Sequence, residues 1–407
     1  MHATTSLPIL WWLALGFLGE SHGVATSLGN NVTLRDNTTE ANCIGVKAIS
    51  PDCNSHETPY HRDFFYVGGH YEDSDLGNLT YDQIYVEKLT PVGGVKQSKP
   101  VIFFHGGGTS GVTWLNTPDN RKGFASFFIE HGYLVYILDQ TSVGRGSEEN
   151  LDDFTLRIGS TAEISEAGFT VPELSDEYPQ SQNHTQWPGS GQKGDPIFDA
   201  FENAFIPLTS NKTAQQLSMR KSGCEMLRLI GSSFLVSHSI GSVNPILLSN
   251  DCPDYVAGSI NLDPDIVPFE DFTGTGMTMS SERPWGFADV SLSYDPPISN
   301  YTELNLTKIG TDTAGNRSCI LQSGSTIRTL PNIASVPFVA LTGEASPHIT
   351  YDHCVIAYLQ QVGGSPDWIK LGDLGITGNG HFAHLELNNL EIAAVVHDWI
   401  QERLKLE

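Results

Sequence analysis

The chain has 407 residues, of which 39% are hydrophobic and 17% are charged, and it contains 40 Gly and 22 Pro. This composition excludes a disordered or fibrous protein and is typical of a globular chain that is rich in turns. The formal net charge of -25 makes binding to nucleic acid or to an anionic membrane surface electrostatically unfavourable, so we expect neither as a partner.

The N-terminus has the pattern of a secretory signal. The apolar segment 7–18 is short for a membrane span, and the small residues Ser21 and Gly23 follow at the spacing that signal peptidase uses. We therefore predict a signal peptide over residues 1–23, a polar segment over residues 24–58, and a secreted, extracellular protein. A membrane anchor is the alternative, because no Lys or Arg precedes the apolar segment.

Six cysteines and eight N-glycosylation sequons agree with a secretory route. The even number of cysteines predicts pairing in an oxidising compartment. No zinc motif matches their spacing, so we expect structural disulfides and no metal. Proximity in the chain favours the pairs Cys43–Cys53, Cys224–Cys252 and Cys319–Cys354. The sequons predict a glycoprotein, and they lie at Asn31, Asn37, Asn78, Asn183, Asn211, Asn300, Asn305 and Asn316.

Regular strand and helix patterns begin near residue 59. Segments 62–71 and 83–89 alternate apolar and polar residues around a gap rich in Gly, Asn and Asp, which predicts a β-hairpin at a sheet edge. The continuous apolar runs 100–104 and 133–138 are typical of buried parallel strands, and a helix is expected between them at 122–131.

A polar stretch that contains Pro and Gly, residues 147–223, interrupts this alternation. Its clearest amphipathic helix is expected at 195–205. We predict that the stretch is a cap inserted between two parts of one core, residues 59–146 and residues 224–407.

Strands and helices alternate again after the cap. Residues 266–332 are irregular and carry three sequons, so we expect them at the surface. Repeated strand–helix units predict an α/β fold with a mostly parallel central sheet and helices on both faces. The expected strands are 233–236, 255–262, 337–341 and 368–371, and the expected helices are 243–248, 352–361 and 390–404.

The pentapeptide Ser-His-Ser-Ile-Gly at 237–241 joins a predicted strand to a predicted helix. Small residues two positions before and after Ser239 allow the sharp turn called a nucleophile elbow, which presents a serine hydroxyl above a sheet at a helix N-terminus. Ser239 is therefore the candidate nucleophile.

A serine hydroxyl needs an imidazole base, which a carboxylate orients. Asp263 ends the next predicted strand, and His381 follows a Gly-Asn-Gly sequence before the last helix. The 24 residues from Ser239 to Asp263 are what one helix, one turn and one strand use. Both side chains should therefore reach the same edge of the sheet, and the order Ser, Asp, His is that of α/β-hydrolases.

Three other residues are alternatives within this triad. Asp265 and Glu344 are the other candidate acids, and His384 is the other candidate base. The position of His381 just before the terminal helix favours it over His384. Metal ligation by the two histidines is disfavoured, because no carboxylate or cysteine has a matching spacing.

The Gly run after the first buried strand is a candidate oxyanion hole. An oxyanion needs N–H groups aimed at one point, and glycines let a carbonyl approach the backbone closely. We assign one donor to Gly107 and the other to Ile240, the residue after the nucleophile. The run is not a P-loop, because no Gly-Lys-Ser/Thr follows.

Aromatic residues in the predicted cap are candidates for an acyl pocket. Trp187, Phe198 and Phe201, together with Phe205, have the apolar character that such a pocket needs. The alternative is that these side chains only pack the cap onto the core.

Taken together, these motifs resemble those of α/β-hydrolase-fold serine esterases, and of a small group of secreted bacterial and fungal esterases in particular. The resemblance covers about residues 60–405 and implies a triad acid after the strand that follows the nucleophile strand, hence Asp263 rather than Glu344. That group commonly has Glu at this position and Gly at position 237. This chain differs from the group at both positions, with Asp263 and Ser237. The resembling stretches are 82–86, 105–114, 117–119, 138–140, 144–146, 185–188, 237–241, 378–381 and 388–389.

The sequence therefore predicts a secreted serine hydrolase that cleaves a small-molecule carboxylic ester through an acyl-enzyme on Ser239. The mechanism requires no metal and no organic cofactor. A lactonase, an acyltransferase or a peptidase with the same triad is an alternative, as is a hydrolase-like binding protein without catalysis. A homodimer is an assembly that the sequence allows.

Overall fold

The computed structural model describes residues 43–273 and 278–406. The predicted signal peptide and the sequons at Asn31 and Asn37 lie outside these residues. None of the helices within the described ranges combines the length and the apolar character needed to cross a bilayer.

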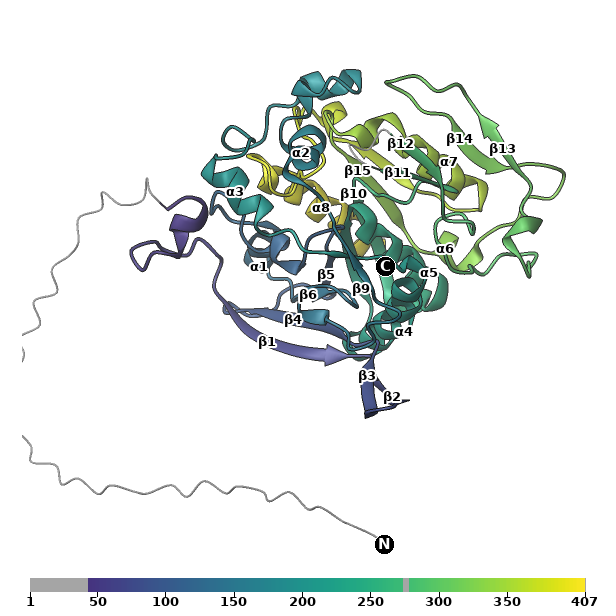
Figure 1. Cartoon of the computed structure of the whole chain (residues 1–407), viewed down its shortest axis with the longest axis horizontal. Helices are drawn as coiled ribbons and strands as arrows, with labels where there is room; N and C mark the ends of the chain where they lie inside the picture. The colour runs from purple at the N-terminus through teal and green to yellow at the C-terminus, as the bar shows by residue number, and fades with distance from the viewer. Residues whose placement is uncertain (1–42, 274–277, 407) are drawn as a thin grey trace, which may run out of the picture. The chain divides into compact units, whose positions relative to one another are not determined.

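A central sheet of eight strands organises the described chain (Figure 1). Strands β1 and β4 pair antiparallel, β4 and β6 do so as well, and every pairing from β6 to β16 is parallel. The prediction of a mostly parallel sheet is confirmed. The order is β1 (Tyr60–Val67), β4 (Ile84–Pro91), β6 (Val135–Asp139), β5 (Val101–Phe104), β9 (Ser233–His238), β10 (Val256–Leu262), β15 (Phe338–Thr342) and β16 (Asp367–Lys370).

The predicted hairpin at the sheet edge is present, with one addition. Strands β1 and β4 form it, and the polar gap between them folds into a small hairpin of β2 (His70–Ser74) and β3 (Gly77–Tyr81). Short strands with exposed polar residues suit this position, because they bury no face of their own.

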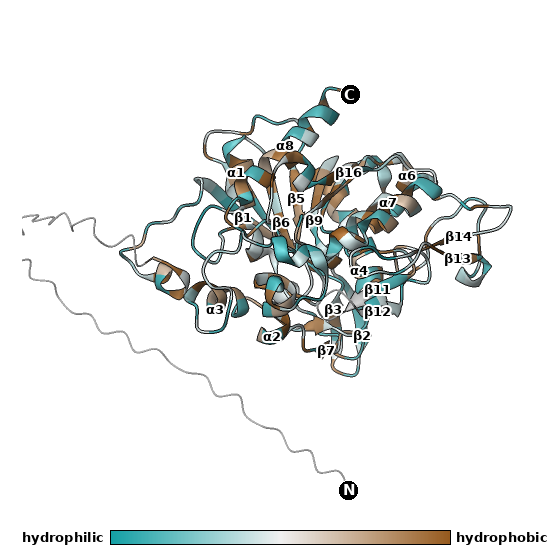
Figure 2. Ribbon diagram, turned by 90° about the horizontal axis from the view of Figure 1, so that it is seen from above, coloured by the Kyte–Doolittle hydropathy of each residue, from teal (hydrophilic) through white to brown (hydrophobic). Residues whose placement is uncertain are grey.

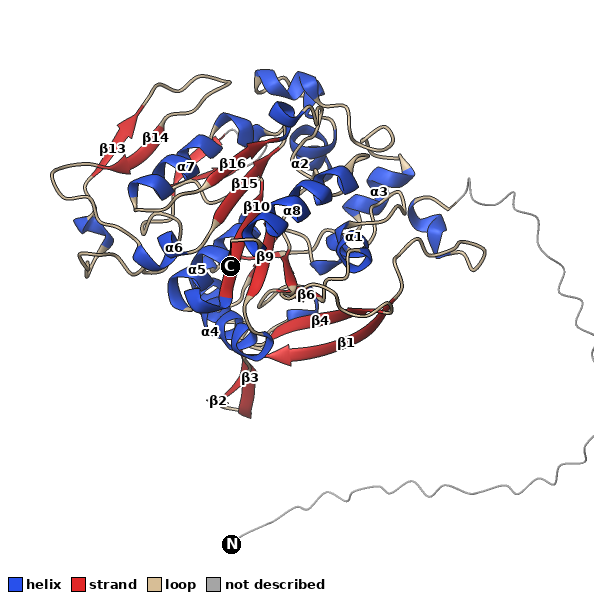
Figure 3. Ribbon diagram, turned by 180° about the vertical axis from the view of Figure 1, so that it is seen from behind, coloured by secondary structure: helices blue, strands red, loops and turns tan. Residues whose placement is uncertain are grey.

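Helices cover both faces of the sheet, as predicted (Figure 3). Two of them, α1 and α8, share a core cluster on one face, whereas α4 to α7 pack on the other. The helices are α1 (Phe124–Glu130), α2 (Ala162–Ser165), α3 (Pro196–Glu202), α4 (Lys212–Ile230), α5 (Val243–Asp251), α6 (Pro331–Ser335), α7 (Asp352–Gln361) and α8 (Asn389–Leu404).

Successive side chains of a strand point to opposite faces of the sheet, so each strand contributes to the core on both faces. In β5, Val101 and Phe103 join the cluster with α1 and α8, whereas Ile102 and Phe104 join the cluster with α4. All four side chains are fully buried, and Figure 2 shows hydrophobic residues gathered around β5, β6 and β9. Burial on both faces explains why these strands are continuous apolar runs in the sequence.

Helix α4 departs from the sequence-based expectation. The expected end of the cap, residue 223, falls inside this helix, which packs on the sheet through Met219, Cys224 and Leu227. Its buried face also includes Gln216, whose side chain bonds to the backbone and carboxylate of Asp289. A face that mixes apolar, small and polar residues gives only a weak helical period, so the pattern resembled a loop.

The cap before α4 consists of short turns and helices. Helix α3 lies within the amphipathic segment expected at 195–205, and Asp195 caps it by accepting from the amides of Ile197 and Phe198. Two short strands, β7 (Leu156–Arg157) and β8 (Leu208–Thr209), pair where the cap begins and ends.

The segment 266–332 is partly a core element, which corrects the prediction that it lies at the surface. Ile266, Phe269, Phe287 and Leu292 are buried in one cluster with α5 and α7. The outer parts are hairpins, β11 (Glu270–Thr273) with β12 (Thr278–Ser281) and β13 (Leu306–Ile309) with β14 (Cys319–Gln322). Single apolar residues spaced irregularly have no period, so periodicity did not reveal their burial.

Three disulfides join the cysteines in the predicted pairs, Cys43–Cys53, Cys224–Cys252 and Cys319–Cys354. His353 lies beside the last pair. Because both neighbouring sulfurs are bonded to each other, this group does not offer thiolate ligands to a metal.

Removing the Cys224–Cys252 disulfide should destabilise the fold. It closes 28 residues between α4 and the turn after α5, and loop-closure entropy predicts a loss of about 3–4 kcal/mol in the free energy of unfolding for the double alanine variant. Urea unfolding followed by circular dichroism measures it. The matched control is the double alanine variant of Cys43–Cys53, which closes 10 residues and should lose less. Equal stability of wild type and the first variant would contradict the expectation.

Candidate active site

Ser239 lies in the sharp turn between β9 and α5. Its φ of 54° is left-handed, a conformation that costs a non-glycine residue on the order of 1–2 kcal/mol and is typical of a nucleophile elbow. A Cβ at position 241 would collide with the carbonyl oxygen of His105, so glycine is required there. At the other small position, the Ser237 hydroxyl donates to Asn261 Oδ1 at 2.8 Å, so the serine side chain is satisfied there.

The structure brings Ser239, His381 and Asp263 together. His381 Nε2 lies 3.1 Å from Ser239 Oγ, and His381 Nδ1 lies 3.1 Å from Asp263 Oδ2. Asp263 follows β10, and its other carboxylate oxygen accepts from the Gly343 amide after β15. The carboxyl ends of three parallel strands thus carry Ser239, Asp263 and Gly343.

The three alternative residues take other positions. Glu344 accepts from the Gly378 amide at 2.9 Å, and Asp265 Oδ1 accepts from Arg283 at 2.9 Å. His384 stacks on Trp114 at 4.6 Å between ring centroids, and both of its nitrogens are buried without a partner among the described residues. The Asp265 amide donates to the Ser239 carbonyl at 3.1 Å, but none of the three side chains bonds to the side chain of Ser239 or His381 within the described chain.

Burial shifts the pKa values of His381 and Asp263. Desolvation lowers the pKa of His381 well below its usual value, and the nearby His348 lowers this pKa further. Burial also raises the pKa of Asp263 to about 6, although His348 and bonds from Ser346 and Gly343 oppose the shift. At neutral pH the imidazole is therefore neutral and able to accept a proton, and the carboxyl group is ionised.

Gly107 and Ile240 lie close together beside Ser239. A Cβ at Gly107 would lie 3.0 Å from Ile240 Cγ2, and one at Gly106 would lie 2.7 Å from His238 Nδ1. The Gly107 amide donates no hydrogen bond to a protein group within the described chain. A free amide next to Ser239 is what an oxyanion requires, and Ile240 follows Ser239 in the same turn.

A cavity of about 210 Å³ opens at Ser239. Phe169, Phe205 and Phe382 line it, so the expectation holds for Phe205 among the cap aromatics. The predicted lining residues Trp187, Phe198 and Phe201 are instead buried as a second layer.

The second layer has a packing role. The Phe201 ring lies 4.9 Å from the rings of Trp187, Phe205 and Phe382. An amphipathic pattern identifies buried side chains but does not separate those that face a cavity from those behind it. The prediction of a lining role for Trp187, Phe198 and Phe201 is therefore corrected to a supporting one.

The cap is joined to both sides of the site. The Ile206 amide donates to the Gly108 carbonyl at 2.8 Å. His184 lies between two carboxylates, with Nδ1 3.0 Å from Glu173 and Nε2 3.1 Å from Glu386. These partners raise the pKa of His184 to about 9 against the opposing effect of burial. Glu386 also accepts from the Gly380 amide, so this ion pair holds the loop that carries His381.

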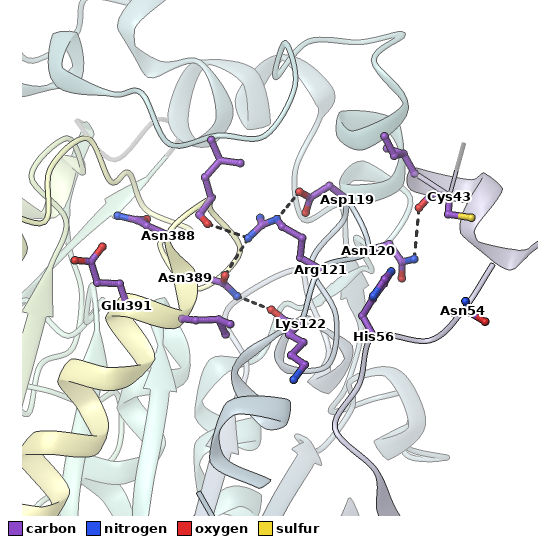
Figure 4. Close-up of a pocket in the computed structure, with 13 residues that line it drawn as sticks. Cys43, Asn54, His56, Asp119, Asn120, Arg121, Lys122, Asn388, Asn389 and Glu391 are labelled. Carbon is purple, nitrogen blue, oxygen red and sulfur yellow. Dashed lines mark hydrogen bonds and ion pairs between the residues drawn. The ribbon is translucent and has the colours of Figure 1, made fainter. Parts of the chain in front are cut away.

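Arg121 holds the same loop from the other side. Its guanidinium donates to the carbonyls of Leu385, Glu386 and Leu387 and to Asn389 Oδ1, as Figure 4 shows in part. A second cavity of about 530 Å³ lies beside Arg121, next to the Cys43 segment and the start of α8. Ser239 does not line this second cavity, and Arg121 there is fully engaged in binding protein groups.

Sequence reasoning missed the residues that support the site. His184, Glu386 and Arg121 are not part of the chemistry, so no spacing rule identifies them. Each lies within a few residues of a stretch that carried the resemblance, at 117–119, 185–188 and 388–389. That proximity was the available signal.

Comparisons with known proteins agree with this geometry. The chain is 39% identical over 342 residues to the probable secreted lipase phiG of Fungal sp. (strain ATCC 74256), an alignment that covers 84% of this chain and 89% of that protein. A solved structure described as a novel bacterial esterase matches 87% of this chain and 99% of its own, with a TM-score of 0.57 at 20% identity, and confirms the α/β-hydrolase fold. Naproxen esterase from Bacillus subtilis matches 84% of this chain and 92% of its own, with a TM-score of 0.39 at 12% identity. No protein-family profile matches the chain.

The ion pair at His184 should make stability depend on pH. The pKa of this histidine is about 9 in the fold and about 6.5 when unfolded. The stabilisation is therefore complete below pH 6.5 and is lost as pH rises through 9, a change on the order of 2–3 kcal/mol. Urea unfolding of wild type and His184→Gln at pH 6, 7.5 and 9.5 measures it. The difference between the two proteins should shrink with rising pH, and a constant difference would contradict this assignment.

Proposed function

Since the chain belongs to the family of secreted lipases and esterases with the α/β-hydrolase fold, we propose that it hydrolyses small carboxylic esters with Ser239 as nucleophile, His381 as base and Asp263 as the acid that orients the base. The observation that supports these roles most directly is the pair of 3.1 Å contacts from His381 to Ser239 and to Asp263. The Gly107 amide, which has no protein partner among the described residues, also supports the proposal.

The first half of the reaction forms the acyl-enzyme. His381 Nε2 takes the proton of the Ser239 hydroxyl as Oγ bonds to the ester carbonyl carbon. The carbonyl oxygen becomes negative and accepts from the amides of Gly107 and Ile240. His381 then returns the proton to the alcohol oxygen, the carbon–oxygen bond to the alcohol breaks, and the acyl group stays on Ser239.

The second half releases the acid. A water molecule gives its proton to His381 and attacks the acyl carbon, and Ser239 leaves with the proton that His381 returns. Throughout, Asp263 stabilises the imidazolium and fixes its Nδ1–H, while the Gly343 amide holds the carboxylate. Lactone hydrolysis and transfer to another acceptor would use the same atoms, so a screen of ester and lactone substrates separates these reactions.

The protein is further proposed to be a secreted glycoprotein. Five sequon asparagines among the described residues are exposed, at Asn78, Asn183, Asn300, Asn305 and Asn316. Three disulfides agree with an oxidising compartment, and the relative phiG is named as secreted. The net charge of -25 argues against nucleic acid or an anionic membrane as a partner.

Ser239→Ala tests the proposed nucleophile. Without the hydroxyl no acyl-enzyme forms, so kcat for p-nitrophenyl butyrate should fall by about 10⁴-fold or more, and a fluorophosphonate probe should no longer label the folded protein. Ser242→Ala is the matched control, because Ser242 is buried in the same turn and bonds to Ser237. A Ser239→Ala variant with near wild-type turnover would overturn the proposal.

Asp263→Asn and Glu344→Gln test the acid as a matched pair. An asparagine at 263 no longer stabilises the imidazolium or fixes its tautomer, so kcat should fall by about 10³- to 10⁴-fold. The glutamine at 344 keeps an acceptor for the Gly378 amide and should change kcat by less than about tenfold. Steady-state kinetics on one short ester measures both, and the reverse ranking would assign the role to Glu344.

A further inference from the structure

The lining of the cavity at Ser239 combines two kinds of residue. Ile164, Phe169 and Phe205 are apolar, whereas Arg157, Lys212, Asp265 and His348 are polar or charged. At about 210 Å³ it is smaller than the roughly 300–1,000 Å³ of pockets for drug-sized ligands. A small cavity of mixed polarity fits a short substrate with a polar group better than a long alkyl chain.

Most of the charged groups at this cavity form ion pairs with one another. Lys212 Nζ contacts Asp271 at 2.8 Å, and buried Arg283 contacts Asp265 at 2.9 Å and Asp271 at 3.0 Å. Arg283 also donates to the backbone carbonyls of Asp265 and Glu270, so it fixes the chain that follows the triad acid. Lys212, Asp271 and Arg283 are therefore bound to protein groups and are not available as the main contact of a ligand.

His348 differs from them. It is 3% exposed, and Nδ1 lies 3.0 Å from Asp352 Oδ1, whose second oxygen accepts from Thr342. The other ring nitrogen, Nε2, has no hydrogen-bond partner among the described residues. Nε2 is not one of the fully buried polar atoms without a partner, and His348 lines the cavity, so this nitrogen is open to a ligand there.

His348 also lies beside the reacting groups. Its ring is parallel to that of His381, with 4.8 Å between centroids and 6° between planes. The opposite face of His381 stacks on Phe169 at 5.3 Å. A substrate bound at Ser239 therefore has an apolar surface on one side of His381 and the His348 ring on the other.

Asp265 offers a second polar atom at this place. Only Oδ1 bonds to Arg283, the side chain is 17% exposed, and Oδ2 has no partner in the described chain. A hydroxyl group can accept from a protonated Nε2 and donate its own proton to the Asp265 carboxylate, so it satisfies both groups at once.

We propose that His348, together with Asp265, binds a hydroxyl group of the substrate, so that the preferred substrates are short esters with a hydroxyl close to the scissile carbonyl. This proposal rests on the proposed ester hydrolysis at Ser239 and adds the substrate class. His348 is then a specificity-determining residue, and its Nδ1 bond to Asp352 fixes the ring that recognises the hydroxyl.

Two pairs of isosteric esters test the proposal. Ethyl 3-hydroxybutyrate is compared with ethyl 3-methylbutyrate for the acyl side, and 2-hydroxyethyl butyrate with propyl butyrate for the alcohol side. Rates come from alkali uptake at constant pH. Wild type should prefer the hydroxylated member of at least one pair by about 10- to 100-fold in kcat/KM, mainly through KM, as expected for one strong hydrogen bond.

His348→Phe keeps the aromatic ring beside His381 and removes the nitrogens. The preference of this variant for the hydroxylated member of a pair should fall to about onefold. Asp265→Asn should reduce the preference in the same direction and serves as the second variant if His348→Phe does not fold. His61→Phe, on an exposed position of β1, is the matched control and should keep the wild-type preference.

The outcomes separate the two proposals. Equal rates within both pairs for wild type, or an unchanged preference in His348→Phe, would overturn the hydroxyl site while leaving ester hydrolysis intact. Hydrolysis of the methyl members that persists in Ser239→Ala would instead overturn the function on which the site rests.

Discussion

The contact between Gly241 and the carbonyl of His105 is the constraint on which the site depends. Because no side chain fits at position 241, the turn with Ser239 and the loop with Gly107 are packed as one unit. The Ser239 hydroxyl and the Gly107 amide therefore have a fixed relation before any ligand arrives, which the proposed stabilisation of a transition state would require. Asp263 joins this unit through its carboxyl group, which accepts from Gly343 and contacts His381.

Much of the architecture is predictable because buried strands have a recognisable pattern of apolar residues in the sequence. Strands buried on both faces are continuous apolar runs, and β5, β6, β9 and β15 were found in this way. The order of Ser239, Asp263 and His381 along the chain limited which strand ends had to meet. Proximity alone gave the three disulfide pairs.

Other features could not be predicted from the sequence, and the reasons are physical. Helix α4 buries Gln216 and Ser218 together with apolar residues, and single buried residues of 266–332 follow no period. Both lack the repeat that pattern reasoning needs. The cavity lining depends on which buried ring is nearest to empty space, so Phe169 and Phe382 could not be told from Phe201. His184 depends on Glu386, which is far away in the sequence, and His348 lines a cavity whose other residues come from distant segments.

The bond from the Ile206 amide to the Gly108 carbonyl has an evolutionary consequence. It ties the insertion that shapes the entrance to the backbone that would steady a developing negative charge. A change in this insertion that admits a new substrate will also shift that backbone. Substrate range and turnover rate are therefore coupled during evolution. Diversification here should proceed more readily by exchanging side chains than by lengthening the insertion.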